Sequence, residues 1–148
     1  MAAALKLLAI RGLSEAELMQ RLLRKGFSEG EAKEARRRCL DLGYLDDRRF
    51  AEERARSLLR SGRGVGQKVL EDLKGRGIDE ARALEALEAA GRDYPEKALL
   101  AEALERRFPD FRYCRADDRQ RRRVVNYFLR RGYSLTPVLS LLKERDER

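Results

Sequence analysis

Residues 18–28 read LMQRLLRKGFS, and this stretch decides the fold because its pattern returns at residues 69–79, VLEDLKGRGID, and at residues 124–134, VVNYFLRRGYS. Each copy places large apolar residues eight and four positions before a glycine, another directly after it, and then Ser or Asp. The glycine can take the left-handed conformation that ends a helix, and the Ser or Asp can cap the next helix. The apolar residue between them can staple the two helices together.

The repeated glycines, Gly26, Gly77 and Gly132, lie 51 and 55 residues apart. Helical repeats of about this length are typical of a tandem array in which each unit buries its apolar face partly against a neighbour. Start and stop signals divide the chain into three three-helix units, residues 1–45, 46–92 and 93–148. No segment alternates apolar and polar residues, so we expect no sheet. The sequence predicts an all-α, elongated and curved array of three helix-turn-helix-like repeats, with about nine helices.

Local signals refine this division. Ser14 with Glu17, and Ser28 with Glu31, have the spacing of capping boxes. We expect Gly91 to end the second unit and the following helix to start near Pro95. The helix signals are weakest in residues 62–66 and 108–116, where we expect bending to concentrate.

The composition excludes most enzyme classes. The chain has no histidine, which removes the usual general base and the zinc motifs that contain histidine. Cys39 continues an apolar stripe with Ala32 and Ala35, so we expect a reduced core thiol there. Cys114 has no assigned role. We predict no catalytic, metal or cofactor site, no small-molecule substrate, no membrane segment, and a cytoplasmic location.

Residues 43–52, GYLDDRRFAE, have two interpretations. In the favoured one, Gly43 ends a helix, and Tyr44 and Leu45 pack in the joint. One aspartate of the pair Asp46 and Asp47 caps the next helix, and both carboxylates favour its positive N-terminal end. Paired aspartates also occur in metal and acid-base sites, but no third ligand or base lies nearby in the sequence. Residues 62–68, GRGVGQK, likewise lack the spacing of a phosphate-binding loop, and we interpret them as a turn.

The net charge of +8 is unevenly distributed. Residues 1–63 carry +5, residues 64–105 carry −4 and residues 106–132 carry +7. Two basic ends therefore flank an acidic middle, which favours separate surfaces for polyanions or acidic proteins. The alternative is a solvated charged face with no partner.

The strongest basic segment predicts a partner or nucleic-acid surface. Its candidate residues are Arg115, Arg119, Arg121, Arg122, Arg123, Arg130 and Arg131. A second cluster is Arg36, Arg37, Arg38, Arg48 and Arg49, and Lys68 is a further candidate. For the second cluster, a binding surface and a purely structural charged face are equally supported, because Glu29, Glu31 and Glu34 lie within reach of its arginines. Few aromatic residues accompany either cluster, which argues against a stacking platform for single strands.

Residues 43–62, GYLDDRRFAEERARSLLRSG, with Val69, Leu73, Gly77 and Ile78 after them, resemble the RecX family of bacterial RecA modulators. The matching positions are Gly43, Tyr44, Asp46, Asp47, Phe50, Ala51 and Gly77. The glycines Gly26 and Gly132 complete the structural signature of the repeat. The opening residues also resemble the family pattern, whereas the third unit matches only in its apolar positions. Arg76 stands where the family usually has lysine.

The resemblance implies three tandem three-helix repeats and no enzymatic activity. It also implies binding to the RecA–DNA filament, with suppression of ATP hydrolysis, strand exchange and co-protease activity, and weak or non-specific binding to bare DNA. Two alternatives remain. A free-standing DNA or RNA binder would bind bare nucleic acid with a steep salt dependence. A helical adaptor for unrelated proteins would show neither property.

Overall fold

A computed structural model describes residues 1–147 of the chain. Over these residues the fold is entirely helical, with nine α-helices, one short 3-10 helix and no strand. The elements are α1 (Ala2–Ile10), α2 (Glu15–Arg24), α3 (Glu29–Asp41), α4 (Asp47–Ser61), α5 (Gln67–Gly75), α6 (Glu80–Asp93), α7 (Glu96–Arg107), η1 (Tyr113–Arg115), α8 (Asp118–Arg130) and α9 (Leu135–Asp146). The predicted fold class is confirmed.

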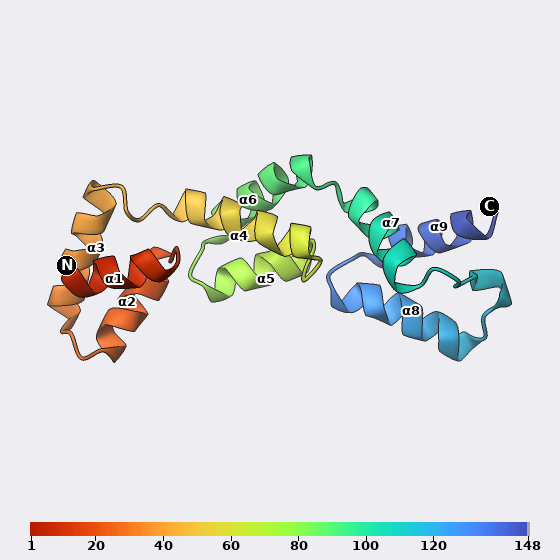
Figure 1. Cartoon of the computed structure of the whole chain (residues 1–148), viewed down its shortest axis with the longest axis horizontal. Coiled ribbons are helices and arrows are strands. Elements are labelled where there is room, and N and C mark those ends of the chain that lie inside the picture. Colours follow the sequence, from red (N-terminus) through yellow and green to blue (C-terminus); the bar gives the residue numbers. More distant parts are fainter. Residues whose placement is uncertain (148) are drawn as a thin grey trace.

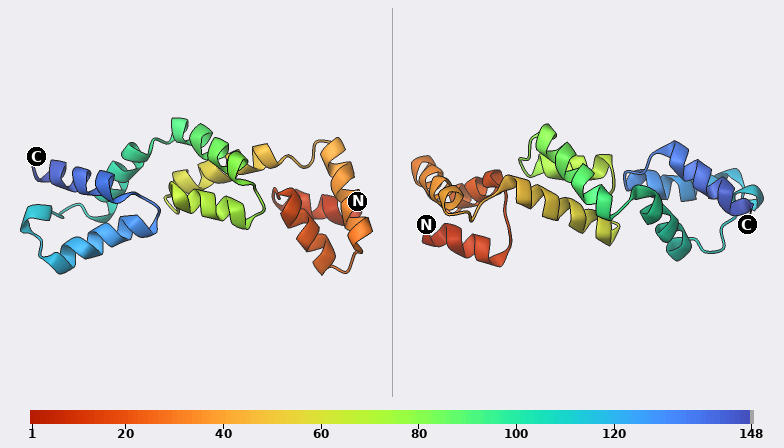
Figure 2. Two further views of the ribbon diagram at one scale, coloured as in Figure 1. Left: turned by 180° about the vertical axis from the view of Figure 1, so that it is seen from behind. Right: turned by 90° about the horizontal axis from the view of Figure 1, so that it is seen from above.

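The helices form an elongated, arched array, with α1–α3 at one end and α7–α9 at the other (Figure 1). The views from behind and from above show the same separation of the two ends (Figure 2). The division at residues 45 and 92 stays a prediction, and helix α6 continues through Gly91 to Asp93. The expected helix stop at Gly91 is therefore wrong, since a glycine late in a helix costs only about 1 kcal/mol and does not break it.

The repeated turn forms as predicted. Gly26, Gly77 and Gly132 have φ angles of 98°, 85° and 102°, in the left-handed region that favours glycine. Both predicted capping boxes, at Ser14 and Ser28, are present. At the third turn Ser134 occupies the N-cap position of α9, but its side chain makes no capping hydrogen bond.

The hydrophobic core does not divide into three. One cluster lies within the first unit and includes Leu18, Leu22 and the buried thiol of Cys39. The second cluster runs without interruption from Ala51 in α4 to Leu142 in α9. The second and third units therefore share one apolar core, and the first unit has its own.

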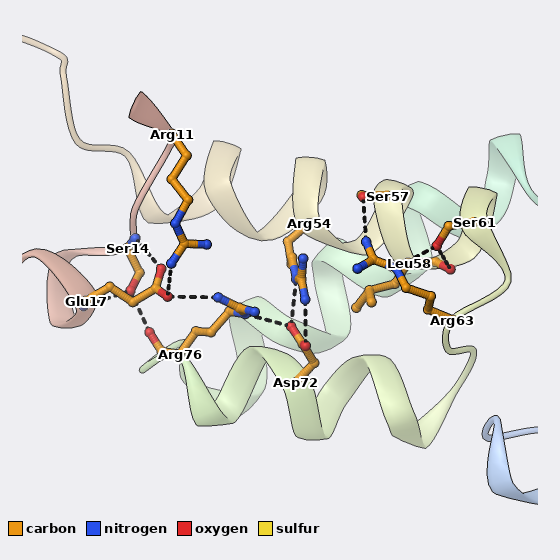
Figure 3. A network of polar contacts seen from close by, with 10 residues as sticks. All are labelled: Arg11, Ser14, Glu17, Arg54, Ser57, Leu58, Ser61, Arg63, Asp72 and Arg76. Atoms are coloured by element: carbon orange, nitrogen blue, oxygen red, sulfur yellow. Dashed lines mark hydrogen bonds and ion pairs between the residues drawn. The ribbon is translucent and has the colours of Figure 1, made fainter. Parts of the chain in front are cut away.

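A polar network joins the first unit to the second (Figure 3). The hydroxyl of Ser14 donates to the backbone oxygen of Arg76, and the guanidinium of Arg76 lies 2.8 Å from Glu17 and 3.0 Å from Asp72. Arg54 donates two hydrogen bonds to Asp72, at 2.9 and 3.0 Å. Glu17, Arg54, Asp72 and Arg76 are all less than one quarter exposed, so water screens these contacts less than it would at the surface.

Asp47 lies in the first turn of α4, as predicted, and has a further role in the neighbouring unit. Asp46 alone caps α4, by accepting from the backbone amide of Arg49. Asp47 is buried and instead accepts a hydrogen bond of 2.9 Å from the backbone amide of Glu15, at the start of α2. The second carboxylate of the pair therefore caps a helix in the neighbouring unit.

Residues 62–66 form the joint between the second and third units. Val65 is only 1% exposed, and its backbone amide donates to the carbonyl oxygen of Arg131 at 2.8 Å. Gly66 and Gly132 lie so close that a side chain at either would meet backbone atoms of the other turn. The expectation that bending concentrates in this loop stays a prediction. The loop's glycines permit close backbone packing against the next unit.

Candidate polyanion-binding site

Helix α8 presents the main basic surface. Its start is fixed by a capping box between Asp117 and Gln120, and Val124 and Phe128 are buried in the shared core. The opposite face of the same helix is therefore directed to solvent. The 13-residue helix carries that face over about 20 Å at 1.5 Å per residue.

Five of the predicted basic residues have exposed guanidinium groups on or beside this face. They are Arg115, Arg119, Arg122, Arg123 and Arg130. Within residues 1–147, none of these side chains makes an ion pair with a carboxylate. The positive charge of this face is therefore available to a partner, as the sequence predicts for a polyanion surface.

Two other predicted residues on α8 have contacts within the fold. Arg121 donates to the backbone oxygen of Tyr113 at 2.9 Å and lies over the Tyr113 ring, 4.4 Å from its centre. Arg131 lies over the ring of Tyr127 at 3.7 Å. Cation–π contacts of this kind orient both guanidinium groups toward the protein. The structure thus separates Arg121 and Arg131 from the exposed arginines.

Tertiary packing adds arginines that the sequence analysis did not select. Arg107 at the end of α7 and Arg112 in the following loop line the same surface hollow as Arg115 and Arg123. Phe108, Phe111 and Val124 contribute apolar atoms to the lining. Only the net charge of residues 106–132 pointed to this region, because nothing in the spacing of Arg107 and Arg112 places them beside α8.

The loop that carries these arginines is held on both sides. The Asp146 carboxylate accepts hydrogen bonds from the backbone amides of Tyr113 and Cys114, at 2.9 and 3.0 Å. The buried side chain of Arg145 donates to the carbonyl oxygens of Phe108 and Pro109. The expectation that bending concentrates in residues 108–116 stays a prediction. Helix α9 supplies this segment with charged hydrogen-bond partners that lie more than 30 residues away in the sequence.

The second basic cluster lies in and beside the first unit, at the opposite end of the array from α8 (Figure 1). Arg37 is paired with Glu34 at 2.6 Å and with Asp41 at 2.9 Å. The hydrogen bond from Arg37 lowers the pKa of the Glu34 carboxyl. Arg48 lies 3.6 Å from Glu52. Much of this cluster is therefore neutralised locally.

The other arginines of the second cluster, and Lys68, differ in exposure and in their contacts. Arg38 is exposed and Arg36 is half-buried, and neither forms an ion pair within residues 1–147. Arg49 donates to the backbone oxygen of Gly43 at 3.4 Å. Lys68 lies 3.7 Å from Glu71, at the joint between the second and third units. The fold places Lys68 against the turn at Gly132 that follows α8, whereas the arginines of the second cluster lie away from α8.

Tyr44 is 53% exposed, beside Leu42, which is 58% exposed. The prediction that Tyr44 packs in a joint is wrong. Leu45 fills that position and is 3% exposed. The backbone amides of both residues point back to the carbonyl oxygen of Cys39. That local turn directs the tyrosine outward.

Among residues 1–147, no group of three or more acidic, histidine or cysteine side chains is arranged to hold a metal ion. No helix in the same residues has the length and apolar character needed to cross a bilayer.

Known proteins match this chain over nearly its full length. A family model described as the first three-helix domain of RecX matches residues 1–39. Regulatory protein RecX of Syntrophotalea carbinolica is 42% identical over 141 residues, which cover 95% of this chain and 92% of the relative. Regulatory protein RecX of Trichlorobacter lovleyi is 34% identical over 142 residues, with coverage of 96% and 92%.

The fold also agrees with a solved structure. A crystal structure of RecX from Lactobacillus salivarius superimposes with a TM-score of 0.77, over 99% of this chain and 94% of that one, at 21% identity. The structural likeness shows the fold, and the sequence identity to the two relatives shows the family. The chain belongs to the RecX family of regulatory proteins, which are not enzymes.

Proposed function

We propose that this protein binds the RecA–DNA filament in the cytoplasm and lowers its ATP hydrolysis, strand exchange and co-protease activity. Membership of the RecX family over nearly the full chain carries the proposal. The arched array supports it, because a long surface can contact several subunits of a helical filament. Contacts at two ends of one scaffold gain avidity when their spacing matches the filament.

The charge distribution supports a division of contacts along the array. The exposed arginines of α8 meet DNA phosphates or acidic RecA surface, and Arg38 at the other end supplies a smaller positive area. The protein needs no cofactor or metal for this role, since binding alone changes the filament. Binding to bare DNA is weak, because the filament offers contacts with RecA that bare DNA lacks.

The test measures ATP hydrolysis by RecA on single-stranded DNA while the purified protein is added up to a stoichiometric amount. We expect the rate to fall. The informative variant replaces Arg119, Arg122 and Arg123 with Ala, and its control replaces Arg24, Lys25 and Arg92, which are also exposed and make no ion pair in the described residues. An unchanged rate with the native protein would contradict the proposal. Equal inhibition by both variants would place the contact elsewhere.

A free-standing nucleic-acid binder is the second candidate, and the unpaired arginine face of α8 favours it. This candidate requires tight binding to bare DNA at physiological salt, with log K falling by about 0.7 for each phosphate contact on a single strand per unit of log salt. Tight binding of this kind together with an unchanged RecA ATPase rate would select it.

A further inference from the structure

The hollow beside α8 has the dimensions and lining of a ligand site. Arg107, Arg112, Arg115 and Arg123 line this hollow, whose volume is about 580 Å³. Small-ligand pockets have volumes of roughly 300–1,000 Å³. These four residues come from three segments: the end of α7, the loop that contains η1, and α8. The fold therefore gathers them around one space.

The charge in the hollow is uncompensated. Within residues 1–147, none of the four guanidinium groups forms an ion pair. Asp110 is the one acidic residue in the lining, and it pairs with none of them. Elsewhere in the chain Arg37, Arg54 and Arg76 are each paired with carboxylates. Four like charges around one space repel one another, and an anionic ligand would relieve that repulsion.

The walls of the hollow are held in place before any ligand binds. The Asp146 carboxylate fixes the backbone of Tyr113 and Cys114, and the Arg121 side chain anchors the carbonyl oxygen of Tyr113. Arg107 lies over the Tyr127 ring at 5.5 Å, and Arg112 donates to the backbone oxygen of Phe111 at 3.0 Å. Arginines that are already oriented lose less conformational freedom on binding, which increases affinity.

We propose that this hollow binds one nucleotide of a single-stranded nucleic acid, with its phosphates on the arginines and its base against the apolar lining. Guanidinium groups form bidentate hydrogen bonds with phosphate. Phe108, Phe111 and Val124 provide apolar surface within the same hollow. Positive charge beside aromatic side chains is the combination that single strands recognise. The basic cluster of α8 has few aromatic residues of its own, and the fold supplies them from the segment that precedes the helix.

The neighbouring surface favours a strand over a single small anion. Arg119, Arg122 and Arg130 continue the positive charge along α8 beyond the hollow. A linear row of this kind matches the regular charges of a nucleic-acid backbone. An unpaired base can enter a recess, whereas a base in a duplex stays stacked inside the helix. The site is therefore specific for single strands. It deepens the proposed function and rests on it for the source of the strand, the DNA of the filament.

The test uses the full chain and a fluorescently labelled oligo(dT), with binding followed by anisotropy across a salt series. The site variant is Arg107→Ala with Arg112→Ala. Its control is Lys97→Ala with Lys143→Ala, which removes the same charge from exposed positions of the same unit outside the hollow. Circular dichroism melting checks that both variants are folded. Phe108 and Phe111 are left unchanged because both pack against the core.

We expect the site variant to bind oligo(dT) at least about tenfold more weakly, with a salt slope smaller by about 0.7 for each phosphate contact removed. We expect the control to stay within about twofold, because separated surface charges are screened at physiological salt. Equal weakening in the two variants would overturn the proposal in favour of diffuse charge. Equal affinity for duplex DNA, or displacement of oligo(dT) by polyglutamate at equal charge concentration, would also overturn it.

The same variants separate this inference from the proposed function. If the site variant loses oligo(dT) binding while the native protein has no effect on RecA, the hollow is a nucleotide site and the proposed action on the filament is wrong. If the native protein inhibits RecA but replacing Arg107 and Arg112 leaves oligo(dT) binding unchanged, the action on the filament is supported and the nucleotide site in the hollow is wrong.

Discussion

The hydroxyl of Ser14 donates a hydrogen bond of 2.5 Å to the carbonyl oxygen of Arg76, 62 residues later, directly before the repeated glycine Gly77. The next joint has the same acceptor position: the amide of Val65 donates to Arg131, directly before Gly132. In both joints the turn that ends the middle helix of one unit packs on the start of the middle helix of the unit before it. The repeated glycine therefore serves both its own turn and the stacking of the array.

Gly132→Ala should destabilise the protein far more than Gly26→Ala. Both glycines have a positive φ, so each substitution costs about 1–2 kcal/mol in backbone conformation. A side chain at Gly132 would also overlap the carbonyl group of Val65, whereas Gly26 has open space around it. Overpacking adds about 1–3 kcal/mol. Urea unfolding followed by circular dichroism measures the difference, and equal losses would refute the role of Gly132 in the joint.

Ser14→Ala should cost more than Ser28→Ala. Both serines form capping boxes, and loss of such a cap costs about 1 kcal/mol. Ser14 also donates to Arg76 across the joint, and that donor is lost as well, leaving the carbonyl oxygen of Arg76 without a partner for about 1 kcal/mol more. The free energy of unfolding of the two variants, measured in the same buffer, isolates the contribution of the joint. A smaller loss for Ser14→Ala would contradict it.

The joint between the first and second units should weaken in acid. Hydrogen bonds from Arg54, with Arg76 beside it, hold the pKa of Asp72 below its ordinary value of 3.8. The folded protein therefore keeps this carboxylate ionised at pH values where the unfolded chain protonates it. The resulting stability is present above the ordinary pKa and is lost as pH falls through the folded pKa. Asp72→Asn should be less stable than native protein at neutral pH, and the difference should shrink in acid.

The contribution of Glu15 to stability should change with pH in the direction opposite to that of Asp72. Burial, and then the neighbouring Asp47 carboxylate, raise the pKa of Glu15 above its ordinary value of 4.5. The folded state thus retains this proton more readily than the unfolded state, and stability falls as pH rises from the ordinary pKa through the folded one. Glu15→Gln should increase stability at neutral pH and leave it unchanged in acid. Unfolding at several pH values for both variants compares the two signs directly.

The elongated shape should be measurable in solution. A compact chain of 148 residues has a radius of gyration near about 15 Å. Small-angle X-ray scattering should give a clearly larger value, since the units contact only their neighbours. A value close to that of a compact chain would mean that the ends fold back on each other.

Much of the helical framework was predictable because its signals are local. The capping boxes at Ser14 and Ser28, and the left-handed glycine turns, depend on residues within one or two helical turns. The exposed arginines Arg119, Arg122 and Arg123 follow from helical periodicity in the same way, because Val124 and Phe128 mark the buried face. The family resemblance is carried by residues within the same local motifs.

The sequence by itself determined the helices, their caps and turns, the repeat and the basic character of the third unit. The tertiary structure alone decided that Asp47 caps a helix in another unit and that Tyr44 faces solvent. It likewise decided that residues 62–66 and 108–116 form hydrogen bonds with residues distant in the sequence. It also decided which arginines are paired and brought Arg107 and Arg112 beside α8. Each of these outcomes depends on partners tens of residues away, whose approach is set by the packing of whole helices and leaves no signal in local spacing.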